Sequence, residues 1–130
     1  MGTGGHQVLD KGFEAGEALT QFTFVKLVTG EDRRVEACDT QGELAIGVVQ
    51  EEVSAEDVTR GPRIVNVRLL GVSVVEAGAT ITKMDEVTPG ADGKAEPAAA
   101  GDRVVGIALD DGADGDWIAV LLTPAGPTVA

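Results

Sequence analysis

The sequence is poor in the residue types that most often carry catalysis or hold metals. Its 130 residues include a single histidine, His6, and a single cysteine, Cys38. One cysteine cannot form an internal disulfide, and no histidine lies near Cys38 in the sequence to activate its thiol. No serine stands in a G-x-S-x-G motif. We therefore predict that the protein is not an enzyme and has no catalytic residues, no cofactor and no metal.

Basic residues are also scarce. The chain has 10 Lys and Arg against 22 Asp and Glu, so its net charge is −12. Direct binding to nucleic acid or to an anionic membrane depends on Lys and Arg, so we expect neither as a partner. No apolar run reaches the ~18 residues of a membrane span. The start, MGTGGHQ, lacks the basic and apolar regions of a signal peptide, which predicts synthesis in the cytoplasm.

Aromatic residues make up only 3% of the chain, and tyrosine is absent. The core must therefore be built from Val, Leu, Ile and Ala. Eighteen glycines indicate many tight turns and hence many short elements. Because turn signals recur at short intervals and no long amphipathic segment occurs, the sequence predicts one all-β domain, a small barrel or sandwich of short strands.

Aliphatic and alternating segments mark the expected strands. Their ranges are Leu19–Val28, Arg34–Asp39, Leu44–Val49, Arg63–Leu70, Val72–Val75, Ala79–Lys83, Glu86–Thr88, Arg103–Leu109 and Asp116–Leu122. Ser54 resembles a helix N-cap followed by acids, which predicts one helical turn after it. Turn signals over 89–93 predict a hairpin connection. Pro97 and Gly101 favour a loop between them.

The sequence repeats several short blocks in the same order. EAGEALT, from Glu14, returns as EAGATIT from Glu76, and ELAIGVVQEE returns as DRVVGIALDD. Each copy closes on an aliphatic strand, so the half-repeats span 14–70 and 76–122. We interpret them as two pseudo-repeated halves of a single β domain over 14–122. A flexible N-terminal arm over 1–13 and an extended C-terminal tail over 123–130 flank this domain.

Both copies of the second block follow the pattern G-x-x-x-x-G. The first glycine of each copy, Gly42 or Gly101, is expected in a turn. The second, Gly47 or Gly106, is expected at a bulge or at a close approach of two backbones. We interpret these four glycines as structural.

Four aspartates gather near the end of the second half, at positions 110, 111, 114 and 116. A calcium loop of the EF-hand type, counted from Asp110, needs an acid at its third position and a Glu at its twelfth. Those positions are Gly112 and Leu121. We therefore interpret the cluster as a solvated hairpin loop.

The few aromatic residues are the candidates for contact with a partner. Trp117 follows the acidic turn at the start of a strand, where it either caps the core or anchors an interface, and both readings stay open. Phe13, Phe22 and Phe24 gather around the first strand, one of whose apolar faces is available for a partner. We predict that these four residues contribute to an interface.

The segment VSVVEAGATITKMDEVTPGADGKAEPAAAGDRVVGIALDDGADGDWIAVLL resembles the C-terminal half of the small capsid decoration, or cement, proteins of tailed bacteriophages. GEALTQFTFVKLVTG and GELAIGVVQEE fit the same pattern, so the resemblance extends over about 14–122. It implies a virion structural protein that binds the outer surface of the phage head. Such proteins commonly form homotrimers at threefold and quasi-threefold positions, where they contact the major capsid protein, bridge capsomers and stabilise the shell.

Two further expectations follow. The N-terminal arm is expected to order on the shell, so that a protein lacking residues 1–12 stays folded but no longer decorates heads. The alternative function is a small β-barrel module that binds carbohydrate or protein on a surface structure. A chain with one Trp and no Tyr is poorly equipped for an aromatic carbohydrate platform, which makes this alternative the weaker one.

Overall fold

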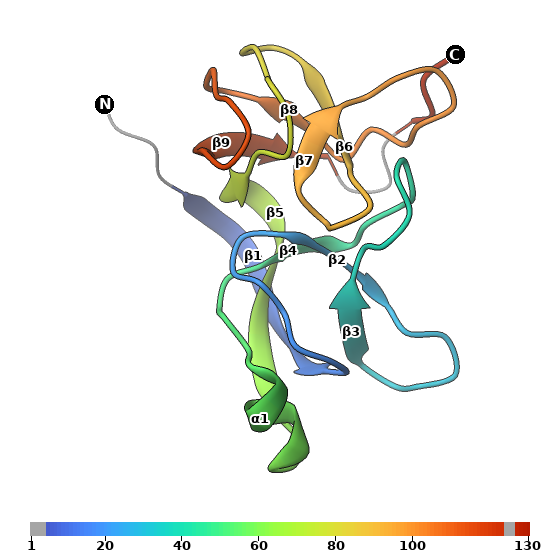
Figure 1. Ribbon diagram of the computed structural model, residues 1–130, viewed down its shortest axis with the longest axis vertical. Coiled ribbons are helices and arrows are strands. Elements are labelled where there is room, and N and C mark those ends of the chain that lie inside the picture. The colour runs from blue at the N-terminus through green and yellow to red at the C-terminus, as the bar shows by residue number, and fades with distance from the viewer. Residues whose placement is uncertain (1–4, 124–126) are drawn as a thin grey trace.

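The computed structural model describes residues 5–123 and 127–130, and its regular structure is almost entirely β (Figure 1). The elements are β1 (His6–Ala15), β2 (Phe24–Leu27), β3 (Arg34–Ala37), β4 (Gly47–Val49), α1 (Ala55–Thr59), β5 (Ile64–Glu76), β6 (Glu86–Pro89), β7 (Ala95–Pro97), β8 (Gly106–Ala108) and β9 (Trp117–Leu122). The prediction of an all-β fold is confirmed. No helix in the described ranges is both long and apolar enough to cross a membrane.

The strand order is that of two copies of one four-stranded unit. In the first half β2 pairs with β3 and β4, and β4 pairs with β5, all antiparallel. In the second half β6 pairs with β7 and β8, and β8 pairs with β9, again antiparallel. Outward from the contact between β5 and β9, the orders β5-β4-β2-β3 and β9-β8-β6-β7 correspond strand for strand. The predicted pseudo-repeat is therefore confirmed.

Individual hydrogen bonds repeat with the strands. Leu19 exchanges two backbone hydrogen bonds with Val53, and its counterpart Ile81 exchanges two with Gly112. Each pair lies outside the named strands. It joins the segment that precedes β2 or β6 to the loop that follows β4 or β8. The repeated blocks in the sequence thus encode the same local pairing twice.

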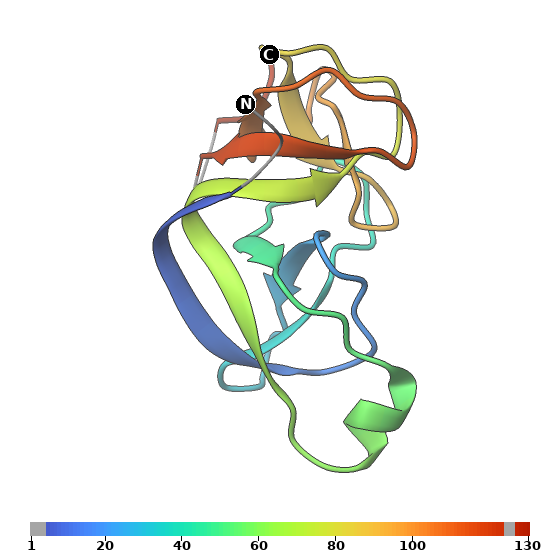
Figure 2. The same cartoon turned by 90° about the vertical axis from the view of Figure 1, so that its left-hand side faces the viewer.

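Each half closes into a small barrel through a strand outside its four-stranded unit. In the first half β1 pairs antiparallel with β5 and, at Ala15 and Val35, parallel with β3, which completes the ring β1-β3-β2-β4-β5. In the second half the last part of β5 takes this place. It pairs with β9, and a parallel bridge joins Ala77 to Ala95 of β7. Strand β5 is therefore a wall of both barrels, and β1 runs along its first part (Figure 2).

The two strands expected on either side of Gly71 are one strand, and the prediction of a break there is wrong. Gly71 has a φ of 109° and still pairs with Gln7 of β1. A Cβ atom at this position would collide with the backbone oxygen of His6. Glycine therefore lets β5 bend from one barrel into the next without losing its neighbours.

The N-terminal arm predicted over 1–13 is corrected from His6 onward, because these residues form β1. Residues 1–4 lie outside the described ranges. β1 pairs with β5 along its length and brings Phe13 into the first core. Deletion of residues 1–12 would remove most of a barrel wall, so the expectation that the remainder stays folded is withdrawn.

Several element boundaries also differ from the prediction. β2 begins at Phe24 because the segment before it turns, and β4 begins at Gly47. Of the strand expected over Ala79–Lys83, the structure keeps the bridge at Ile81. The loop expected over Glu96, Pro97 and the following alanines begins later, because Glu96 and Pro97 belong to the edge strand β7. A proline is tolerated there because its missing N–H faces away from the ladder. The helical turn after Ser54 is confirmed, with a capping box between Ser54 and Asp57.

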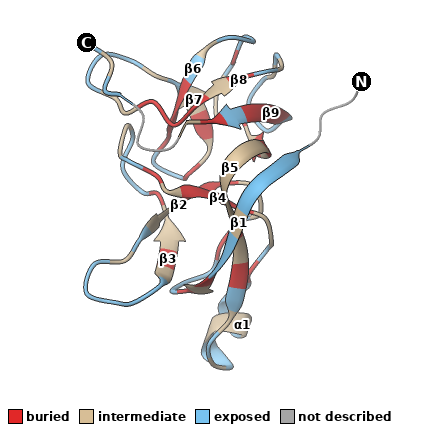
Figure 3. Cartoon of the chain, turned by 180° about the vertical axis from the view of Figure 1, so that it is seen from behind, coloured by how far each residue is buried: buried red, intermediate tan, exposed pale blue. Residues whose placement is uncertain are grey.

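The buried residues form two clusters, one for each barrel. The first contains Leu19, Val35 and Val65, and the second contains Ile81, Val87 and Ile118. Figure 3 shows that buried positions gather where the strands of each barrel face one another, whereas much of β1 is exposed. As the composition predicts, both clusters are almost wholly aliphatic.

The described part of the C-terminal tail is extended and lies on the second barrel. Thr128 forms an antiparallel bridge with Arg103. The N–H of Val104 donates to the carbonyl of Pro127, and the N–H of Val129 donates to the carbonyl of Asp102. These bonds place the end of the chain along the segment that leads into β8.

Candidate functional site

The four glycines noted in the sequence lie at corresponding places in the two halves. Gly42 and Gly101 have φ angles of 82° and 90°, in the left-handed region that favours glycine. Gly47 and Gly106 begin β4 and β8, where a Cβ atom would collide with the neighbouring strand. Their positions are explained by the fold and require no ligand.

Many acidic side chains hold turns together. Asp57, Asp85, Asp102 and Asp116 each accept a hydrogen bond from the backbone N–H three residues before them. Asp111 also accepts one from a backbone N–H. In the ranges that the structure describes, no three His, Cys, Asp or Glu residues are grouped so as to hold a metal ion.

Cys38 is in no position to act as a nucleophile. The residue is 1% exposed. Burial, reinforced by the nearby Glu43 carboxylate, raises the pKa of its thiol to about 12. Because the thiolate is the reactive form, Cys38 at neutral pH serves as a small core residue. His6 lies at the exposed start of β1.

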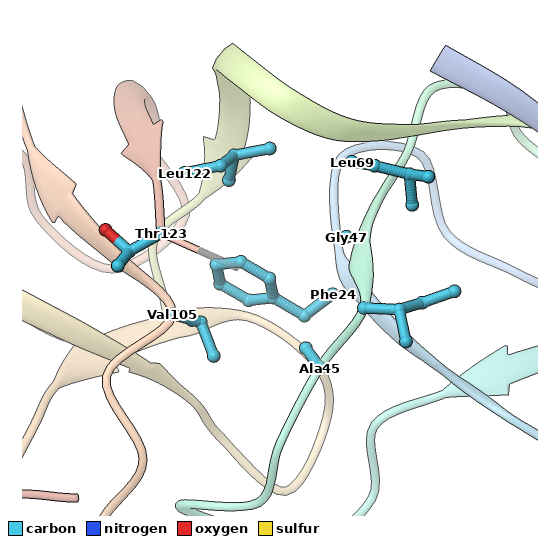
Figure 4. A pocket seen from close by; sticks show the side chains of 8 residues that line it. Phe24, Ala45, Gly47, Leu69, Val105, Leu122 and Thr123 are labelled. Atoms are coloured by element: carbon cyan, nitrogen blue, oxygen red, sulfur yellow. The ribbon is translucent and has the colours of Figure 1, made fainter. Parts of the chain in front are cut away.

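Two of the four aromatic candidates are covered by the protein itself. Phe24 is 1% exposed and lies at the junction of the halves, among Val105, Leu122 and Thr123 of the second half (Figure 4). The space left beside it is about 10 Å³, which is close to the room that one water molecule needs. Phe13 is 7% exposed and belongs to the first core. The surface open to a partner therefore does not include Phe24.

The other two candidates form an exposed aromatic pair. Trp117, at the start of β9, is 56% exposed, and Phe22, in the turn before β2, is half-buried. Their ring centroids are 4.9 Å apart with an interplanar angle of 84°, an edge-to-face arrangement. The backbone N–H of Glu76 donates to the carbonyl of Phe22. The pair thus joins the two halves and leaves more than half of the Trp117 surface exposed.

The left-handed backbone of Phe22 belongs to the repeat. Phe22 has a φ of 64°, and its counterpart Met84 has a φ of 77°. Their N–H groups donate to the corresponding carbonyls of Val49 and Ala108. Because the strained conformation occurs in both halves, it is a property of this turn and not a sign of a ligand site.

Basic side chains are engaged in ion pairs along the sheet. The Nζ atom of Lys26 lies 2.7 Å from Oδ1 of Asp39 and 3.1 Å from Oε2 of Glu43. The hydrogen bond to Asp39 raises the pKa of Lys26 and lowers the pKa of Asp39. Lys94 is paired in the same way with Glu76, 3.1 Å away. These lysines are paired with carboxylates, and because Asp and Glu outnumber Lys and Arg, the protein keeps a net negative charge.

An apolar groove of about 480 Å³ lies at the mouth of the first barrel. We call it the leucine groove, and its lining residues are Leu9, Phe13, Leu27, Leu44, Ala45, Ile46, Leu69 and Leu70. Leu9, Leu27 and Leu44 are 46%, 49% and 43% exposed. No charged side chain lines it, which sets it apart on a chain of net charge −12.

Sequence reasoning found the aromatic pair in part and missed the leucine groove. Among the aromatic candidates it named Trp117 and Phe22, but nothing in their spacing shows that the two rings meet. Leu27 and Leu44 read in the sequence as ordinary members of apolar strands, so they carry no local signal. Only the placement of β1 shows that these side chains stand at an open mouth.

The chain was compared with protein-family models, with curated proteins and with solved structures, and only the solved structures gave a match. A scan of protein-family models finds no match for the chain, and a search of curated proteins finds none either. Among solved structures, the N base of head fiber gp8.5 of bacteriophage phi29 is similar, with a TM-score of 0.72 and 19% sequence identity. The match covers 92% of this chain and 97% of that one. At this level of identity the likeness establishes a shared fold.

Proposed function

We propose that the chain is a virion structural protein that binds the outer surface of a phage head and has no enzymatic role. The observation that carries this proposal is the fold shared, over nearly the whole of both chains, with a domain of a phage head fiber. The sequence resemblance to capsid decoration proteins points independently in the same direction. A compact β body whose one thiol is buried and protonated is suited to a structural role.

The finer proposal is that the protein decorates the shell as a homotrimer at threefold and quasi-threefold positions, contacts the major capsid protein and bridges capsomers. Three copies around one axis allow a modest contact per chain to hold the assembly through avidity. The net charge of −12 supports an outer location, because packaged DNA repels an acidic body. It also argues against direct contact with nucleic acid or an anionic membrane.

The exposed Trp117 and Phe22 pair is the proposed anchor of one of these contacts, since Trp is enriched among residues that dominate interface energies. Phe13 belongs to the first core and also lines the leucine groove. Phe24 is assigned to the junction of the halves.

The test is to add the purified protein to heads stripped of it and to image them by cryo-electron microscopy. Density at the threefold and quasi-threefold positions supports the proposal, and analytical ultracentrifugation of the free protein measures whether it is trimeric. Trp117→Ala is expected to weaken binding about tenfold or more, as loss of an interface anchor does. Heads that stay bare at saturating protein would overturn the proposal.

The second candidate is a module that binds carbohydrate on a surface structure. The observation in its favour is the exposure of Trp117, which is 56%. Glycan-array binding that Trp117→Ala abolishes, together with heads that stay bare, would favour this function over decoration.

A further inference from the structure

The leucine groove lies where the wall of the first barrel is incomplete. β1 pairs with β5 from His6 to Glu14, but on its other edge it meets β3 only at Glu14 and Ala15. Between residues 8 and 12 this edge has no strand partner among the described residues. Leu9 lines the groove from the unpaired part of β1, whereas Leu27 and Leu44 line it from across the opening.

In the second half the corresponding positions are buried. They are Pro89 and Leu122, the counterparts of Leu27 and Leu69. Leu122 lies beside Phe24 and Leu69 at the junction of the halves, and the carbonyl of Pro89 accepts a hydrogen bond from the N–H of Gly42.

The tail forms the bridge of Thr128 with Arg103, the counterpart of Leu44. In the described ranges Leu44 forms no such bridge. An extended segment without charged side chains therefore runs along residues 102–104 of the second half. In the described ranges no such segment runs along the corresponding residues 43–45 of the first half.

The size of the groove favours a segment over the body of a second copy. About 480 Å³ falls within the range of ~300–1,000 Å³ that recognition pockets usually have. A stable interface between two folded proteins needs roughly 800 Å² from each partner, which exceeds what one such groove offers.

The free edge of β1 supplies a further means of recognising a bound segment. Unpaired N–H and C=O groups along a strand edge accept an added strand, and neighbouring pockets then take its side chains. Here the free edge and the apolar pocket are adjacent, because Leu9 belongs to both. Backbone groups would hold the segment, and the leucines would select aliphatic side chains.

We propose that the leucine groove binds an extended, uncharged segment of the shell protein, one that carries large aliphatic side chains and adds to the free edge of β1. This inference rests on the proposed function, since it names the contact through which the protein is held on the head. The occupant resembles the chain's own Pro127–Ala130, which has no charged side chain and runs along residues 102–104, the counterparts of residues 43–45 at the groove.

The test compares Leu27→Glu with a matched control, Leu109→Glu. Both leucines are exposed to a similar extent, 49% and 41%, but Leu109 lies in the second half, away from the groove residues. Neither change touches a fully buried side chain, so circular dichroism and thermal unfolding should match the unchanged protein. Binding to stripped heads, measured by co-sedimentation, should weaken at least tenfold for Leu27→Glu and change less than twofold for Leu109→Glu.

Hydrogen exchange gives an independent readout. On heads, the amides of residues 8–12 and 44–45 should exchange at least tenfold more slowly than in the free protein.

The outcomes separate the two proposals. If the unchanged protein does not bind heads, the proposed function is wrong, and the proposed binding of a shell-protein segment is wrong with it. If it binds and Leu27→Glu binds equally well, the groove contact alone is wrong. If Leu27→Glu instead breaks a free oligomer apart in ultracentrifugation, a second copy occupies the groove and the shell segment is excluded.

Discussion

In the second half of the molecule Pro89 and Leu122 are buried, whereas their counterparts in the first half, Leu27 and Leu69, line an open groove. The strand order around these positions is the same in both halves. What differs is what lies beside them. Leu122 stands at the junction with the first half, next to Phe24 and Leu69, and the tail runs along residues 102–104, whereas no described segment covers the groove. A duplicated fold thus yields one half in which these positions are covered and one half in which they offer a surface.

The halves differ also in the side chains of one cross-strand pair. In the first half Asp10 of β1 stands opposite Arg68, with Oδ1 3.0 Å from Nε, and the pair is nearly buried. The corresponding positions in the second half are Val72 and Leu121. One half therefore uses an ion pair where the other uses two aliphatic side chains, which provides a direct test of what each arrangement contributes.

The largest expected effect comes from the junction that couples the halves. Phe24→Ala removes the ring packed among residues of the second half and should lower the free energy of unfolding by about 3–5 kcal/mol, the usual cost of deleting a buried Phe. Urea denaturation measures this loss. A loss below ~1 kcal/mol would mean that the site collapses around the cavity and that the junction is not tightly packed.

The next effect concerns the ion pair of the first half. Asp10→Ala leaves Arg68 nearly buried without its carboxylate, which should cost about 3 kcal/mol. The double change Asp10→Val with Arg68→Leu copies the pair of the second half and should restore stability to within ~1 kcal/mol, because apolar replacements of buried pairs are often neutral or stabilising. Urea denaturation of both variants checks this. A double variant as unstable as the single one would contradict the equivalence of the two positions.

The same pair predicts a pH dependence. Burial alone raises the pKa of Asp10, but hydrogen bonds from Arg68 and Asn66 outweigh it, so this pKa lies below its ordinary value of 3.8. The contribution of the carboxylate is therefore complete above about pH 4 and is lost as the pH falls through the lowered pKa. Denaturation curves at pH 7 and pH 3 should show a smaller acid loss for the double variant than for the unchanged protein. Equal losses would assign the acid sensitivity to other carboxylates.

Replacing the glycine at either close approach of two strands, Gly47 or Gly106, should lower the free energy of unfolding by a similar amount. Gly47→Ala and Gly106→Ala each force a Cβ atom into the neighbouring strand and should each destabilise the protein by about 1–3 kcal/mol. Gly101→Ala is the control, because its φ of 90° is unfavourable but no atom stands near, so it should cost about 1–2 kcal/mol from backbone strain alone. Thermal unfolding compares the three. A cost at only one of the two approaches would show that one half is more pliable.

The smallest effect is expected at the aromatic pair. Trp117→Ala loses an edge-to-face contact at an exposed site, and should cost about 0.5–1.5 kcal/mol. Ile64→Ala, at the corresponding place in the first half and 63% exposed, should cost less than 0.5 kcal/mol, as most surface changes do. Chemical denaturation distinguishes the two. A larger loss at Trp117 would make it a structural cap, and would weaken its assignment as an interface anchor.

The sequence by itself determined the class of fold, the duplication and the aliphatic nature of the cores. These follow from local features: β-branched segments, turn glycines and blocks that recur in order, each readable within a few residues. The capping box at Ser54 and the roles of Gly42 and Gly101 are of the same kind, since a turn is specified by its own residues.

The tertiary structure alone decided the rest. Whether Gly71 ends a strand or bends it depends on β1 lying alongside, and whether the start of the chain is an arm or a wall depends on β5 receiving it. Leu27 and Pro89 both stand in short β-strands, yet one is exposed and the other buried because of chain segments that lie far away in sequence. Burial is a sum over such distant neighbours, so the open groove of the first half appears only when the whole chain is folded.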